Sequence, residues 1–128
     1  MMMSGEIPSF AKYILLFGFI VSLIFGVWYF FSPESWSTIT EWPVETASGR
    51  VVGAILIVLA IGSLLAYRAS SWKEVELFVI VLVAWNLFGA IGMVWNMLVL
   101  PLPIAGWFMT GLLVLFFVLN LYMYIQCR

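Results

Sequence analysis

The chain has 128 residues, of which 66% are hydrophobic and 9% carry a charge, and its formal net charge is −1. Soluble domains contain roughly a quarter charged residues and about half apolar ones, so a soluble fold of this length could not bury so much apolar surface. We therefore expect a membrane protein whose first partner is the lipid bilayer. No run of basic residues suggests binding to nucleic acid.

Four segments are apolar and long enough to cross a bilayer, which takes about 20 helical residues. They cover residues 10–31, 50–69, 75–100 and 104–126. Backbone polar groups in lipid must be paired within such a segment, and these segments lack the alternation of barrel strands. The sequence thus predicts one all-α domain over residues 1–128, a polytopic membrane protein with four transmembrane helices in one bundle.

The first span carries Gly18, Ser22 and Gly26 at intervals of four residues, so the three share one helix face. Small residues let membrane helices approach closely, and this face is predicted to pack against another span. The apolar run after Lys12 is long enough to cross the membrane and contains no small-residue cleavage site. We therefore expect it to be a retained helix and not a cleaved signal.

The loop after the first span is the longest, and Ser32-Pro33-Glu34 is typical of a helix start. We expect a short interfacial helix on the outer surface, with Trp36 and Trp42 inserted among lipid headgroups. Two functional alternatives stay open for this loop, namely a docking surface for a partner and a lid over the mouth of the bundle.

The second span opens with Gly49 and Gly53, a further pair of small residues four positions apart that predicts helix packing. The third span has the same kind of residue in Gly89, on the face that begins with Asn86.

Asn86 and its neighbour Trp85 lie near the middle of the third span, where a polar side chain is costly. Ser22 and Ser63 lie at comparable depth on the first two spans, and either could form a hydrogen bond with the Asn86 amide. In one interpretation this polar cluster only holds helices together, through bonds worth about 0.6 kcal/mol on average. In the other, Asn86 and Trp85 line a small ligand pocket.

The fourth span follows the turn Pro101-Leu102-Pro103. Asn96, before the turn, and Asn120, in the fourth span, are expected near helix ends, where water or a neighbouring carbonyl would satisfy them.

Positive charges predict the orientation, because cytoplasmic loops carry an excess of Lys and Arg. An even number of spans places both termini and the second loop on one side, and that side holds Lys12, Arg68, Lys73 and Arg128. The other side holds only Arg50. We therefore expect both termini to be cytoplasmic, in a plasma or cytoplasmic membrane.

Several kinds of reactive residue are missing from the sequence. It contains no His and one Cys, Cys127, which argues against a His-ligated metal, a bis-His haem and an internal disulfide. No carboxylate lies within a span, where a proton relay usually needs one. Glu74 and Glu76 are interpreted as solvated charges that set the topology. We expect no enzymatic activity, no metal and no cofactor.

Three features together are similar to the DoxX-like group of small four-helix membrane proteins: FSPESW after the first span, GRVVGAILIVLAIG at the second, and a short turn after it. The resemblance covers most of the chain. It implies a four-span fold and an accessory role, and it transfers no site residue.

The first functional hypothesis is therefore a non-catalytic accessory or scaffold subunit that binds other membrane protein subunits or associates with itself. A small oligomeric transporter or channel is an alternative, with Asn86, Ser22, Ser63 and Thr110 along its polar path. A third possibility is a binder of a lipid, quinone or other apolar ligand, with Trp85 and Asn86 as its pocket.

Overall fold

A computed structural model describes residues 5–43 and 45–128, and this part of the chain contains five helices and no strand. Four helices are long and apolar enough to span a membrane: α1 (Ser9–Phe31), α3 (Thr46–Arg68), α4 (Trp72–Val99) and α5 (Ala105–Cys127). The short helix α2 (Pro33–Thr40) lies between α1 and α3. The predicted all-α fold with four spans is confirmed, and the chain is an integral membrane protein.

Two of the spanning helices begin several residues before the apolar runs that predicted them. α3 begins at Thr46 and α4 at Trp72, several residues before the predicted starts at 50 and 75. Polar residues can continue a helix where it leaves the hydrocarbon, because backbone pairing does not depend on side-chain polarity. The amide of Gly49 already donates to the carbonyl of Glu45 at 2.8 Å.

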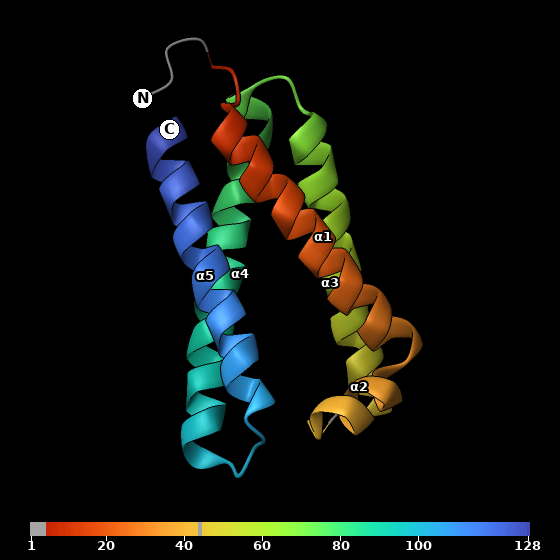
Figure 1. Cartoon of the computed structure of the whole chain (residues 1–128). Coiled ribbons are helices and arrows are strands. Elements are labelled where there is room, and N and C mark those ends of the chain that lie inside the picture. Colours follow the sequence, from red (N-terminus) through yellow and green to blue (C-terminus); the bar gives the residue numbers. More distant parts are fainter. Residues whose placement is uncertain (1–4, 44) are drawn as a thin grey trace.

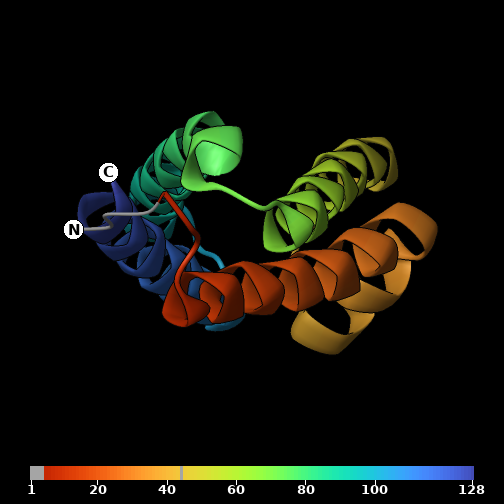
Figure 2. The same cartoon turned by 90° about the horizontal axis from the view of Figure 1, so that it is seen from above.

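The four spans are arranged as two antiparallel pairs. α1 packs along α3 and α4 along α5, with much more contact inside each pair than between the pairs. The pairs meet near the C-terminus and diverge toward α2 (Figure 1). Seen along the helices, they form two walls (Figure 2). The start of α1 and the C-terminus lie at the same end, as four spans require, and the cytoplasmic location of that end stays a prediction.

Close backbone contact explains the tight packing of α1 on α3. A Cβ atom added to Gly53 would lie 2.8 Å from the Gly26 carbonyl oxygen and 2.8 Å from Phe30 Cα. A Cβ atom on Gly26 would lie 2.9 Å from the backbone nitrogen of Ile57. These distances are too short for a real side chain, so glycine at both positions lets the two backbones touch.

A hydrophobic cluster joins the two pairs at the terminal end of the molecule. Its most enclosed members are Ala11 and Leu15 of α1, Val79 of α4 and Met123 of α5. Glu74 stabilises the start of α4 there, because its Oε2 accepts hydrogen bonds from backbone amides just before the helix, at 2.9 and 3.3 Å. Glu74 is therefore a helix cap as well as a surface charge.

Trp36 lies inside the protein, so the expectation that it inserts among lipid headgroups is wrong. Its indole is 3% exposed and packs against the rings of Phe25, Trp28 and Tyr29, with centroids 5.0–5.4 Å apart. A large aromatic side chain is better accommodated among other rings than at an exposed surface when α2 folds back onto α1. α2 is thereby held against the bundle.

Trp42 connects the two pairs at the end where they diverge. A Cβ atom on Gly106, in the first turn of α5, would lie 2.7 Å from Cζ3 of the Trp42 ring. The side chain of Met97, at the end of α4, reaches the same place. The segment after α2 therefore contacts the α4–α5 pair across the gap.

Candidate functional site

A cavity of about 190 Å³ lies between the two helix pairs, and all five helices contribute to its wall. It lies between the hydrophobic cluster at the terminal end and the aromatic cluster around Trp36, which also lines it. An engineered apolar cavity of about 150 Å³ is known to hold a benzene molecule. The space is therefore sufficient for a small ring or for part of an alkyl chain.

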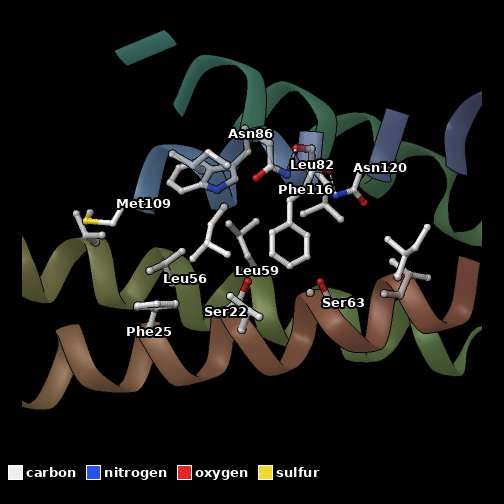
Figure 3. Close-up of a pocket in the computed structure, with 18 of the residues that line it drawn as sticks. Ser22, Phe25, Leu56, Leu59, Ser63, Leu82, Asn86, Met109, Phe116 and Asn120 are labelled. Atoms are coloured by element: carbon white, nitrogen blue, oxygen red, sulfur yellow. Dashed lines mark hydrogen bonds between the residues drawn. The ribbon is translucent and has the colours of Figure 1, made fainter. Parts of the chain in front are cut away.

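The wall of the cavity is mostly aliphatic and aromatic. Leu56 and Leu59 of α3 face Phe116 of α5 across it (Figure 3), and Leu112 of α5 also lines it. None of the described residues that line it is Lys, Arg, Asp or Glu. Such a surface favours apolar ligands, and the few polar groups on it would fix the orientation of a ligand and provide specificity.

The four residues predicted to form the polar cluster all line this cavity: Ser22, Ser63, Trp85 and Asn86. They come from three helices, and the pairing of α1 with α3 places the two serines on one wall. Figure 3 shows the serine hydroxyls on the side opposite Asn86. Tertiary packing thus brings the predicted residues together around an open space.

The expected hydrogen bond between Asn86 and a serine is absent from the described part of the chain. Instead, Nδ2 of Asn86 donates to the carbonyl of Leu82, one turn earlier on the same helix, at 2.8 Å. The cavity keeps the α4 wall apart from Ser22 and Ser63, so an intrahelical acceptor is the one within reach. Asn86 is 6% exposed, and its amide makes no hydrogen bond to another helix within residues 5–43 and 45–128.

Asn120 is a site residue that sequence reasoning missed. The sequence did not predict that Asn120 would be 3% exposed and would line the cavity. The expectation that a neighbouring carbonyl would satisfy Asn120 is confirmed, because its Nδ2 donates to the carbonyl of Phe116 at 2.7 Å. Its amide therefore has the same geometry as that of Asn86. One signal in the sequence could have indicated the burial of Asn120. This residue is a lone Asn inside an apolar span, more than two helical turns before the nearest charged residue, Arg128.

The glycines predicted to pack helices occupy different environments. Gly49 is buried in the first turn of α3, and a Cβ atom on Gly89 would lie 3.1 Å from the side chain of Leu113 on α5. Gly18 lines the cavity, and an added Cβ atom there would be 3.8 Å from its nearest neighbours, which is an ordinary contact. The stripe on α1 therefore makes close backbone contact at Gly26 and an ordinary contact beside the cavity at Gly18.

Among the described residues, no group of three or more His, Cys, Asp or Glu side chains could hold a metal ion.

Two indole nitrogens in the same part of the chain, Nε1 of Trp36 and of Trp72, are enclosed without an acceptor.

No protein-family model matches the chain, and neither does any curated protein or solved structure. The resemblance to the DoxX-like group stays a prediction from the sequence.

Proposed function

We propose that this protein binds an apolar molecule drawn from the bilayer and holds it between the two helix pairs. The observation that carries the proposal is the cavity of about 190 Å³, apolar over most of its wall, which also contains the polar side chains of Ser22, Ser63, Asn86 and Asn120. Pockets that combine an apolar surface with a few convergent polar groups are typical of small-molecule sites. The site is held within the spans, so its ligand would arrive through lipid.

The test is to extract the protein gently from its membrane and to identify co-purifying molecules by native mass spectrometry. Gly18→Leu would fill the cavity, because its Cβ atom meets nothing closer than 3.8 Å. Gly111→Leu is the matched control, since Gly111 is exposed on α5 with nothing within 4 Å of its Cβ position. The proposal requires a bound molecule in the wild type and in Gly111→Leu, and its loss in Gly18→Leu.

An accessory or scaffold role is the second candidate. It is supported by Gly92 and Gly111 on the α4–α5 pair, where an added Cβ atom would meet nothing within 4 Å. Another membrane helix could approach the backbone closely at such positions. A partner that co-purifies with Gly18→Leu but not with Gly111→Leu would favour this role over ligand binding.

A further inference from the structure

The two buried amides in the cavity present the same atom to it. Nδ2 of Asn86 and Nδ2 of Asn120 each donate to a carbonyl one turn earlier, at 2.8 and 2.7 Å. This bond sets the orientation of the amide group, because Oδ1 in that position would face another oxygen. Oδ1 of each residue is therefore turned away from its own helix carbonyl (Figure 3).

Neither Oδ1 atom has a donor in the described part of the chain, although both residues are more than nine-tenths buried. In this part of the chain, the side-chain atoms that are fully enclosed and have no partner are the indole nitrogens of Trp36 and Trp72. The two Oδ1 atoms are not among them, so each Oδ1 keeps some accessible surface. Both residues line the cavity. A buried carbonyl oxygen without a donor is unfavourable, so the α4–α5 wall presents two acceptors that a bound molecule could satisfy.

The opposite wall supplies hydroxyl groups. Ser22 and Ser63 line the cavity from α1 and α3, and their hydroxyls point toward the space between the pairs (Figure 3). A hydroxyl can donate or accept. Polar groups on both walls can therefore pair with a hydroxyl group of a molecule held between them.

A charged group would not be compensated here, because no Lys, Arg, Asp or Glu is among the described lining residues. Removing an ion from water without a counter-charge is far more costly than removing a neutral hydroxyl. A purely hydrocarbon ligand would leave both Oδ1 atoms without a donor. A neutral molecule with a hydroxyl on an alkyl chain or ring fits both kinds of surface. Its hydroxyl can donate to an Oδ1 atom, and its apolar part can contact the apolar wall.

We propose that the cavity selects a neutral, hydroxyl-bearing amphiphile, whose hydroxyl donates to Oδ1 of Asn86 or Asn120 while its apolar part fills the space against Leu56, Leu59 and Phe116. This rests on the proposed function, since it specifies the chemistry of the same site. The apolar remainder of a longer ligand would extend between the helix pairs into lipid.

The test uses the full chain in nanodiscs and three photoreactive probes with the same sixteen-carbon chain: a primary alcohol, its methyl ether and the corresponding carboxylate. Competition between each probe and its unlabelled form gives an apparent affinity, and peptide mapping places the cross-link. We expect the alcohol to label cavity residues and to bind about tenfold more tightly than the ether, as one additional hydrogen bond allows. The carboxylate should bind more weakly than the alcohol.

Matched variants assign the difference to the amides. Asn86→Leu and Asn120→Leu should each bring the alcohol closer to the affinity of the ether, and the double variant should abolish the preference. Asn96→Leu is the control, because Asn96 is exposed near the end of α4 and does not line the cavity. It should keep the full preference.

The outcomes separate the two levels of the proposal. Equal labelling of the cavity by alcohol and ether would overturn the hydroxyl selection and leave the apolar site standing. A preference that survives in the double variant would also overturn it. No labelling of cavity residues by any probe would contradict the binding function itself.

Discussion

The contact between α1 and α3 gives the sharpest prediction about stability. Replacing Gly53 with Ala places a methyl group 2.8 Å from the Gly26 carbonyl oxygen and from Phe30 Cα, and closer still to the Phe30 backbone nitrogen. Ordinary contacts begin at 3.4 Å, so the backbones must separate locally by at least about 0.6 Å (3.4 − 2.8), and by more at the Phe30 nitrogen. The obstructing atoms belong to the backbone, and rotation of a side chain cannot relieve them.

Overpacking of this kind costs about 1–3 kcal/mol, while Ala in place of Gly within a helix returns up to about 1 kcal/mol. We expect Gly53→Ala to lower the free energy of unfolding by about 1–2 kcal/mol. Reversible unfolding in mixed detergent micelles, followed by tryptophan fluorescence and far-UV circular dichroism, measures the difference.

The matched control is Gly92→Ala, because a Cβ atom on Gly92 meets nothing within 4 Å. It should leave stability unchanged or raise it by up to about 1 kcal/mol through helix propensity. The reasoning is refuted if Gly53→Ala is at least as stable as Gly92→Ala, since the two backbones would then not be in the contact described.

Three further changes test other contacts by the same unfolding measurement. Asn86→Leu should alter stability by less than about 1 kcal/mol, because the lost bond goes to a Leu82 carbonyl within the same helix; a loss above 3 kcal/mol would mean that Asn86 does link helices. Glu74→Ala should cost about 0.5–2 kcal/mol, because two amides before α4 lose their acceptor, whereas Glu76→Ala should be close to neutral. Trp36→Ala should cost about 3–5 kcal/mol, since it empties the centre of an aromatic cluster; a cost below 1 kcal/mol would indicate that α2 is not packed on α1.

The sequence by itself was sufficient for the number and kind of elements. Four apolar runs predict four helices because a backbone in lipid has to pair its own polar groups, whatever the side chains next to it. The short helix at Pro33 also follows from local chemistry. The predicted helix boundaries were less accurate, as at the starts of α3 (Thr46) and α4 (Trp72). Hydropathy marks the edge of the hydrocarbon, whereas a helix continues as far as its backbone amides are paired.

Only the tertiary structure decided which small and polar residues touch one another. Gly18 and Gly26 share a helix face in the sequence, yet α1 meets α3 at Gly26 and borders the cavity at Gly18. Asn86 and Asn120 each carry the same amide, and their depth in the span does not reveal what that amide bonds. The angle between the two helix pairs keeps the α4–α5 wall apart from Ser22 and Ser63, and each amide bonds a carbonyl of its own helix. That angle results from contacts far apart in the chain, such as Trp42 with Gly106, which no local pattern encodes.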